Sequence, residues 1–176
     1  YTLALAGDTQ ACNAAVVLEA VEMLRERGVR IKDEAVAAGL AAVRMPCCFE
    51  LMPGRARFIL DTPRTRAQAM AMRANFDFYY DSLCRAAIIS ALRGPDTAEM
   101  AACAASGCRA AVCLTAPEEE AVPAEELARM VQDVGCTAVI CDTPDKAIAA
   151  AIAAAGRDGA VCCMVTPETG REVRAN

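Results

Sequence analysis

Residues 138–165 read AVICDTPDKAIAAAIAAAGRDGAVCCMV. Two continuous apolar runs, at 138–141 and 160–165, enclose an Ala-rich stretch that starts at Pro144 and stops before Gly156. Proline suits the first turn of a helix and glycine suits its end, so the Ala-rich stretch is expected to be a helix. Apolar runs without alternation are typical of strands buried on both faces. This segment therefore predicts a strand, a helix and a second, parallel strand.

The same alternation extends over most of the chain. Further strands are expected at 49–51, 56–60, 86–89 and 110–114, and further helices at 8–27, 33–43, 97–105 and 123–134. The first two of these strands are joined around Pro53–Gly54, a pair typical of turns. Strands and helices at this spacing form right-handed βαβ units. We therefore expect an α/β fold with three layers, in which a mainly parallel, Rossmann-like sheet carries helices on both faces.

No linker or shift in composition divides the sequence, so we expect a single domain over residues 1–176. The first residue is Tyr1 rather than Met, which favours a domain taken from a longer chain.

Composition excludes several classes of function. The 18 basic residues are scattered among 23 acidic ones, so no nucleic-acid surface is expected. Every apolar run is shorter than a membrane span, so no membrane segment is expected either. The chain has no His, which rules out a Ser-His-Asp triad, a Cys-His dyad and His-containing metal sites within it. It also lacks a Walker A motif and a GxGxxG motif, so it does not read as an autonomous nucleotide enzyme.

The eleven Cys residues favour a reducing compartment. Most lie inside apolar runs, and no pair has the CxxC spacing of zinc or redox motifs. We therefore expect reduced, largely buried thiols without disulfides, in a cytoplasmic protein. A reactive thiol at Cys47–Cys48 is the alternative.

Polar residues follow the expected strands at their carboxyl ends, where parallel sheets bind ligands. These residues are Asp61, Arg93, Thr115, Asp142 and Thr166. Asp142 precedes Thr143–Pro144 and is interpreted as part of a helix cap. The aromatic cluster at 76–80 is interpreted as packing, and the acidic run at 118–120 as a solvated loop.

Several short motifs follow one another in an order that resembles a known family. They are Leu3-Ala4-Leu5-Ala6-Gly7, Thr9-Gln10, Asn13-Ala14, Met45-Pro46, Phe49-Glu50, a strand ending at Asp61, and the stretches 122–127 and 170–174. The order is similar to G-x-H-Q-x-x-N-A, W-P-G-R-x-E and D-G-A-H-N in the carboxy-terminal region of folylpolyglutamate synthase/dihydrofolate synthase, a member of the Mur ligase superfamily. The resemblance covers nearly all of the chain.

The resemblance implies a fold of the Mur ligase C-terminal domain type and a place in a longer enzyme. Members of the family carry an N-terminal P-loop ATPase domain and use ATP and Mg²⁺ to activate a folate carboxylate as an acyl phosphate. Glutamate then attacks to form an amide. The C-terminal domain closes over ATP and helps to seat the amino acid. By this resemblance the chain is such a lid, with the P-loop domain of its parent as partner.

Several polar positions of the family motifs differ here. The His of H-Q is Thr9, the Gly-Arg pair is Cys47–Cys48, a D-K-D loop has become Gly94–Pro95–Asp96, and the Arg of R-A is Glu120. D-G-A-H-N has become Asp61-Thr62-Pro63-Arg64-Thr65 and keeps only the Asp. The lost groups are donors suited to anionic ligands, so the resemblance implies a weakened or altered chemistry.

The retained positions are the candidate site residues. They are Asp61 and Arg64, on the nucleotide or amino-acid side, together with Asn13 and Glu50. No catalytic residue and no metal site is assigned, and the isolated chain is expected to be inactive and to bind ATP only weakly. Two other functions stay open: a non-catalytic binding or interaction domain that inherited the lid fold, and the C-terminal domain of a muramyl ligase.

Overall fold

The computed structural model describes residues 1–52 and 57–175. The chain divides into two compact units, Tyr1–Pro46 and Cys47–Asn176, which we call the helical unit and the sheet unit. The sequence shows no linker and therefore did not predict this division. The turn expected at Pro53–Gly54 and the first residue of the strand expected at 56–60 lie outside the described residues.

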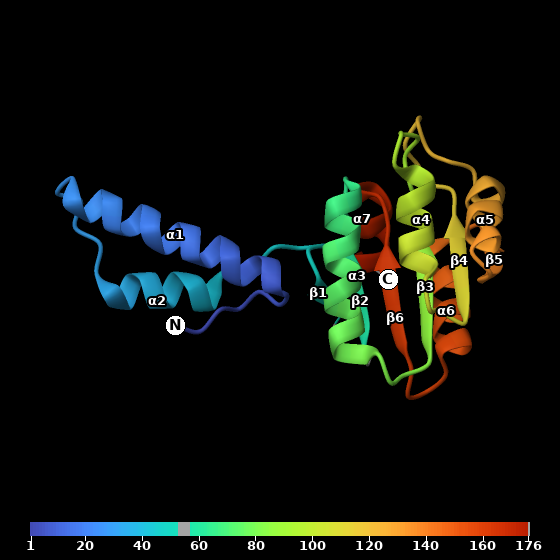
Figure 1. Ribbon diagram of the computed structural model, residues 1–176, viewed down its shortest axis with the longest axis horizontal. Coiled ribbons are helices and arrows are strands. Elements are labelled where there is room, and N and C mark those ends of the chain that lie inside the picture. The colour runs from blue at the N-terminus through green and yellow to red at the C-terminus, as the bar shows by residue number, and fades with distance from the viewer. Residues whose placement is uncertain (53–56, 176) are drawn as a thin grey trace. The chain divides into compact units, whose positions relative to one another are not determined.

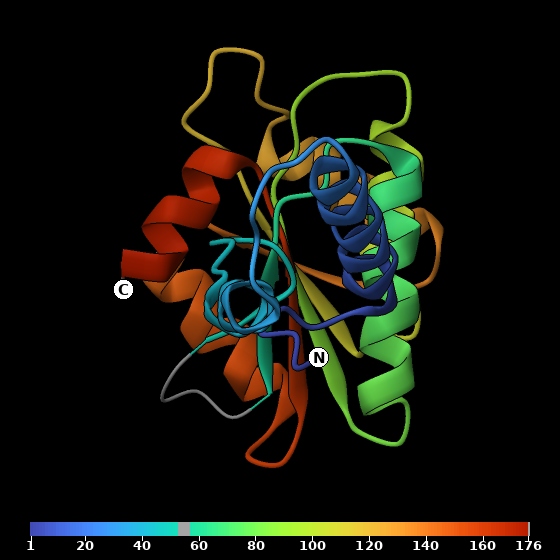
Figure 2. The ribbon, with the colours of Figure 1, turned by 90° about the vertical axis from the view of Figure 1, so that its left-hand side faces the viewer.

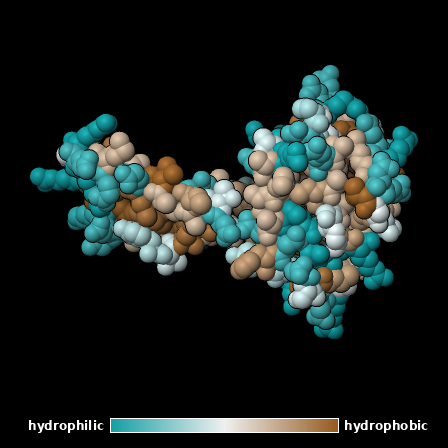
Figure 3. Space-filling model, viewed as in Figure 1, coloured by the Kyte–Doolittle hydropathy of each residue, from teal (hydrophilic) through white to brown (hydrophobic). Residues whose placement is uncertain are grey.

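The helical unit consists of α1 (Asp8–Glu26) and α2 (Asp33–Ala42), both close to the expected bounds. Arg25 joins the two helices, because its Nε donates to the carbonyl of Ile31 at 2.9 Å and its guanidinium pairs with Asp33 at 2.7 Å. On α2 the buried apolar side chains are Val36 and Leu40. On α1, by contrast, large apolar side chains are exposed: Val16, Val17, Met23 and Leu24. Figure 3 shows apolar side chains gathered on the surface of this unit.

The sheet unit is built on one six-stranded sheet with the order β1-β2-β6-β3-β4-β5. The strands are β1 (Glu50–Leu51), β2 (Phe58–Asp61), β3 (Arg85–Ile89), β4 (Ala110–Leu114), β5 (Thr137–Cys141) and β6 (Ala160–Met164). β1 is antiparallel to β2, and all other pairs are parallel. At the centre, Cys162 of β6 lies in register between Ile59 of β2 and Ala87 of β3. The mainly parallel sheet predicted from the apolar runs is therefore confirmed.

Helices cover both faces of the sheet, as predicted. One face carries α3 (Arg66–Tyr80), α4 (Thr97–Ala105) and α5 (Ala124–Asp133), and the other carries α6 (Pro144–Ala155) and α7 (Pro167–Ala175). Figure 1 labels these elements, and Figure 2 shows the sheet between α3 on one side and α6 and α7 on the other. Each face has its own core: Phe76 and Leu127 are fully buried on the first face, and Phe58 and Leu60 on the second. The three-layer α/β fold is therefore confirmed.

Two helices were not expected from the sequence. The buried side of α3 follows helical spacing at Ala69, Met72, Arg73 and Phe76, but a charged residue interrupts the apolar pattern. The large apolar side chain that α7 buries is Val173, and the helix contains Gly170, so its sequence shows little apolar periodicity. No helix in the described part of the chain is long and apolar enough to span a membrane.

The topology places a crevice between β3 and β6. These strands are neighbours in the sheet, yet α4 follows β3 on one face and α7 follows β6 on the other. The two connections diverge at the carboxyl ends of the strands, which is where ligands bind in open α/β sheets.

Candidate functional site

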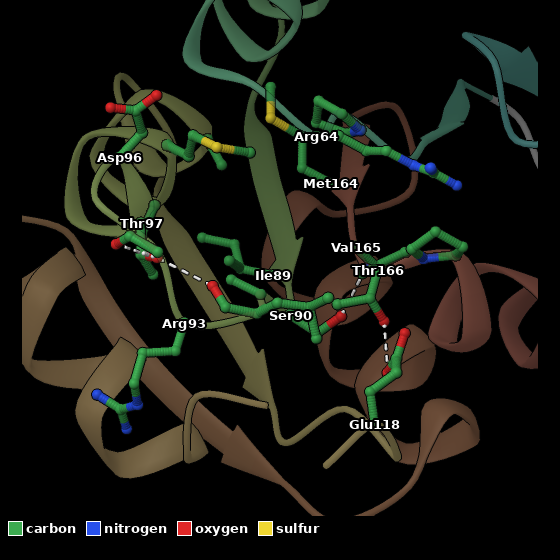
Figure 4. Close-up of a pocket in the computed structure, with 18 of the residues that line it drawn as sticks. Arg64, Ile89, Ser90, Arg93, Asp96, Thr97, Glu118, Met164, Val165 and Thr166 are labelled. Atoms are coloured by element: carbon green, nitrogen blue, oxygen red, sulfur yellow. Dashed lines mark hydrogen bonds between the residues drawn. The ribbon is translucent and has the colours of Figure 1, made fainter. Parts of the chain in front are cut away.

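A pocket of about 580 Å³ occupies this crevice (Figure 4). Its lining comes from the connections that follow β2, β3 and β6, together with one residue of the connection after β4. These residues include Pro63 and Arg64, the segment 89–97, Glu118, and the segment 164–168 with Arg171. Of the polar residues expected at strand ends, the structure brings Arg93 and Thr166 into the pocket lining.

Three arginines line the pocket, and two of them already have carboxylate partners. Arg93 forms a two-pronged pair with Glu126, at 3.0 and 2.9 Å. Arg171 pairs with Glu168 at 2.5 Å. The backbone N–H of Arg64 donates to a side-chain amide at 2.8 Å, but its exposed guanidinium has no ion-pair partner among the residues that the structure describes. Arg64 is therefore the pocket arginine whose charge is available to a ligand.

The rim of the pocket is formed by two connections that bond to each other. The backbone N–H of Arg93 donates to the carbonyl of Glu120 at 2.8 Å, and that of Val122 donates to the carbonyl of Ala91 at 2.9 Å. The hydroxyl of Thr97, at the start of α4, donates to the backbone carbonyl of Leu92 at 2.9 Å and folds the β3 connection back. The rim is thus fixed by two backbone–backbone bonds and by the side-chain hydroxyl of Thr97.

The connection from β6 to α7 holds a small polar network. The backbone N–H of Thr166 donates to the hydroxyl of Ser90 at 3.0 Å, and the Thr166 hydroxyl donates to the carboxylate of Glu118 at 3.0 Å. That carboxylate also accepts the backbone N–H of Glu168, at 3.4 Å. The interpretation of the acidic run at 118–120 as a solvated loop fits Glu119 and Glu120, which are exposed, but not Glu118, which is half-buried and bonded to a donor 48 residues away.

Asp61 ends β2 next to this pocket, although it is not one of the lining residues. Its Oδ1 accepts the backbone N–H of Thr62 at 2.8 Å, and the backbone N–H of Phe49 also bonds to it. Burial raises the pKa of Asp61 from 3.8 to about 6, because the charged form is poorly solvated there. At neutral pH the carboxyl is therefore mostly ionised, and it becomes protonated as the pH falls through about 6.

Glu50 contacts Cys47, which is bonded to the loop that follows Asp61. Its carboxylate accepts the backbone N–H of Cys47 at 2.8 Å and pairs with Arg174 of α7 at 3.0 Å. The carbonyl of Cys47 in turn accepts the backbone N–H of Thr62, the residue after Asp61. Glu50 and Asp61 are thus brought together around Cys47, and Glu50 is engaged in structural contacts.

The thiol of Cys47 does not have the environment of a nucleophile. Burial, followed by the charge of Glu50, raises its pKa. A raised pKa leaves the thiol protonated at neutral pH, whereas reactive cysteines have lowered values. The structure gives all eleven cysteines as free, and burial raises the pKa of Cys113 to about 12.

Two further residues are not among those that line the pocket. Asn13 belongs to α1 of the helical unit, where its amide donates to Gln10 at 3.1 Å. Asp142 follows the edge strand β5 and pairs with Lys146 of α6 at 2.9 Å, beside the capping hydroxyl of Thr143. The interpretation of Asp142 as part of a helix cap fits these contacts.

Sequence reasoning missed Ser90, Glu118, Thr169 and Arg171. Thr169 belongs to the polar network at the start of α7, because its hydroxyl accepts the Thr166 hydroxyl at 3.0 Å and its backbone N–H donates to that oxygen at 3.4 Å. Ser90 and Thr169 are 5% and 2% exposed and look like ordinary polar residues in the sequence. Their only signal was position, since Ser90 follows the apolar run of β3 and Thr169 lies shortly after that of β6.

Comparisons with known proteins identify solved structures that share the fold of this chain. No protein-family model matches this chain, and no curated protein matches it. Among solved structures, folylpolyglutamate synthase from Mycobacterium tuberculosis, complexed with ADP and AMPPCP, is similar with a TM-score of 0.80 and 24% identity. Folylpolyglutamate synthase from Thermotoga maritima has a TM-score of 0.75 and 18% identity. The bifunctional folylpolyglutamate synthase/dihydrofolate synthase from Yersinia pestis, complexed with AMPPNP and Mn ion, has a TM-score of 0.74 and 21% identity.

These matches cover much more of this chain than of the solved ones. They include 98%, 99% and 89% of this chain, but 40%, 39% and 37% of the M. tuberculosis, T. maritima and Y. pestis chains. The chain therefore spans about two fifths of the length of the proteins whose fold it shares.

Proposed function

We propose that this chain is the C-terminal lid domain of an ATP-dependent C–N ligase of the folylpolyglutamate synthase/dihydrofolate synthase type, acting in the cytoplasm on a folate and glutamate. The observation that carries the proposal is the fold, which is shared over nearly the whole chain with the synthases described above. The order of motifs from Thr9-Gln10 to the strand ending at Asp61 supports the same family.

In this proposal the nucleotide and the metal belong to the parent enzyme. The M. tuberculosis and Y. pestis proteins were solved with adenine nucleotides, and the latter with Mn. Within the described residues, no group of three or more acidic or thiol side chains could hold a metal ion. We therefore assign ATP and Mg²⁺ to an N-terminal P-loop domain, which would supply the charge neutralisation needed for phosphoryl transfer.

Arg64 is the residue of this chain that we assign to ligand binding. Its guanidinium is exposed at the pocket and is suited to a carboxylate or phosphate, which it can bind with two parallel hydrogen bonds. Asp61, three residues earlier, would orient the loop through its bond to Thr62 and could accept a proton near neutral pH.

The second candidate is a non-catalytic interaction domain with the same fold. It is favoured by the way other polar groups are used: Glu50 is engaged by Arg174, and Arg93 by Glu126. Side chains that are consumed by internal pairs contribute little to a ligand. A muramyl ligase domain has no comparable support, since the similar structures described above are folate enzymes.

The decisive experiment uses the full-length protein that contains these residues. With ATP, Mg²⁺, L-glutamate and dihydropteroate or a reduced folate, we expect folate-dependent release of ADP and addition of one glutamyl residue, detected by mass. Arg64→Ala should raise the KM of a substrate by roughly tenfold or more, since a charge-assisted hydrogen bond is lost. Arg66→Ala is the matched control, because Arg66 pairs with Glu99 on the surface. Absence of turnover with every folate would favour the interaction domain.

A further inference from the structure

The start of α7 is occupied by a carboxylate that comes from elsewhere in the chain. Glu118, in the connection between β4 and α5, accepts the Thr166 hydroxyl at 3.0 Å and the Glu168 backbone N–H at 3.4 Å (Figure 4). Thr166 is only 5% exposed. If Glu118 moved away, the Thr166 hydroxyl would keep the Thr169 hydroxyl as an acceptor at 3.0 Å, whereas the Glu168 N–H would lose its carboxylate acceptor. Free N–H groups at a helix start and the positive end of its dipole favour an anion. In this structure the Glu118 carboxylate is the anion at the start of α7, in the wall of the pocket.

The surroundings of Glu118 allow its carboxylate to leave the start of α7 and an external anion to take its place. Its backbone connection is held at a different point, where the segment 120–122 bonds to the β3 connection. Release of the side chain therefore requires rotation of Glu118 and leaves the rim bonded. Arg64 also lines the pocket, so an incoming anion would meet an available cationic group as well as the vacated donors.

We propose that Glu118 is an autoinhibitory residue of this pocket: a ligand with an acidic group, carboxylate or phosphate, binds beside Thr166 by displacing the Glu118 carboxylate. The proposal rests on the proposed function only in taking this pocket as a ligand site. Glu118 lowers the affinity of the pocket for acidic ligands in two ways. Its carboxylate accepts the hydrogen bonds that the ligand would accept, and its negative charge repels the ligand. A weakly bound anion then leaves the Glu118 carboxylate in place, and a ligand that also engages Arg64 displaces it.

The test measures anion binding directly and needs no ligase activity. Inorganic phosphate and succinate are titrated separately into the chain, and the backbone amides of Thr166 and Glu168 are followed by NMR. Three variants are compared with the unmodified protein. Glu118→Ala removes both the occupant and its charge, and Glu118→Gln removes the charge but leaves an amide oxygen that can still accept from Thr166. Glu119→Ala removes the same charge from the next residue of the loop, which is exposed.

We expect Glu118→Ala to bind at least one of the two anions roughly tenfold more tightly than the unmodified protein, Glu118→Gln to show a smaller gain, and Glu119→Ala to show none. The anion with the larger gain distinguishes a phosphate ligand from a carboxylate ligand. The gain should disappear in Glu118→Ala/Thr166→Val, which lacks the hydroxyl donor. No gain in Glu118→Ala, or an equal gain in Glu119→Ala, would overturn the proposal. Thermal unfolding of each variant verifies that it is folded. A failed ligase assay would leave this result unaffected.

Discussion

The Nε of Arg174 donates to both carboxylate oxygens of Glu50, at 3.0 and 3.2 Å, across 124 residues of sequence. Glu50 also accepts the backbone N–H of Cys47 at 2.8 Å. A position that matches a family motif therefore fastens the last helix to the first strand of the sheet unit. In this chain its contacts are structural, whatever its role in relatives.

Glu50→Ala should lower the free energy of unfolding by about 1–2 kcal/mol, since the backbone N–H of Cys47 and the guanidinium of Arg174 lose their acceptor. Arg174→Ala should lower it less, because Arg174 is exposed and its ion pair is screened by water. Urea unfolding of both single variants and the double variant measures the coupling. Fully additive effects would show that the pair contributes nothing.

Asp61→Asn should stabilise the protein at pH 8 and not at pH 4. The folded-state pKa is raised, from 3.8 to about 6, so the folded state favours the protonated form. Stability is therefore greatest below about pH 4 for this group, and it falls as the pH rises through 6. The loss at high pH is about 2 kcal/mol, since one pKa unit corresponds to 1.36 kcal/mol and relaxation of the site reduces the effect. Tm values of both proteins from pH 4 to 8 test this, and a constant difference across that range would contradict it.

Gly170→Ala should destabilise the sheet unit by about 1–2 kcal/mol, because a Cβ there would lie 2.9 Å from the methyl carbon of Thr62 and 3.3 Å from the sulfur of Cys47. Gly39→Ala in α2 is the matched control. It meets nothing within 4 Å and should stabilise its helix by about 0.5–1 kcal/mol. Opposite signs in chemical unfolding are the expected result. If both variants are stabilised, α7 does not contact the Asp61 loop as described.

Asp77→Asn should cost about 2–4 kcal/mol. Asp77 is shared by Arg73 and Arg85, whose side chains are 8% and 12% exposed, so its loss leaves Arg73 without its counter-charge and Arg85 with the exposed Asp81 alone. The partial exposure of Asp77 keeps the cost below that of a fully buried pair. Asp81→Asn is the control: Asp81 is 84% exposed and lies 3.6 Å from Arg85, so it should change the stability by less than about 0.5 kcal/mol. Equal losses of stability in the two variants would show that Asp77 is not the main counter-charge of Arg73 and Arg85.

The isolated chain should bind Mg²⁺·ATP only in the millimolar range or more weakly. Matched motif positions that are cationic in the family are Cys48, Pro95 and Glu120 here, and each lost charge-assisted hydrogen bond costs roughly 1.5–3 kcal/mol. Several such losses correspond to orders of magnitude in affinity. Calorimetric titration measures this. Micromolar binding would contradict it, and Asp61→Ala and Arg64→Ala would then locate the nucleotide.

The central strands of this fold were predictable because burial on both faces leaves a direct trace in the sequence. Runs such as 110–114 and 160–164 are apolar at every position, and every residue in them is buried. The expectation of burial on both faces was wrong for the run 138–141, because β5 lies at the edge of the sheet and Ile140 is 50% exposed. The helix α3 was not predictable in the same way, since the buried Arg73 takes the place of an apolar residue, and its partner Asp77 is recognised only when both lie on one helix.

The candidate site was predictable only in its location. The rule that ligands bind at the carboxyl ends of parallel strands indicated the edge of the sheet at which the pocket lies, and Arg64, a predicted site residue, lines that pocket. Glu118 could not be identified, because its importance arises from a contact with Thr166 that depends on the order of β3, β4 and β6 in the sheet. Strand order is a property of the folded chain that apolar periodicity does not encode.

The exposed apolar side chains of α1 have a consequence for the cooperativity of the protein. With Val36 and Leu40 as the large buried side chains of α2, the helical unit has little interior to lose, whereas the central strands bury every side chain of β4 and β6. Regions with few buried contacts open at lower free energy than the core. Backbone amides of α1 and α2 should therefore exchange with deuterium well before those of β4 and β6, and a protease should cut within 8–42 while the sheet unit is still intact.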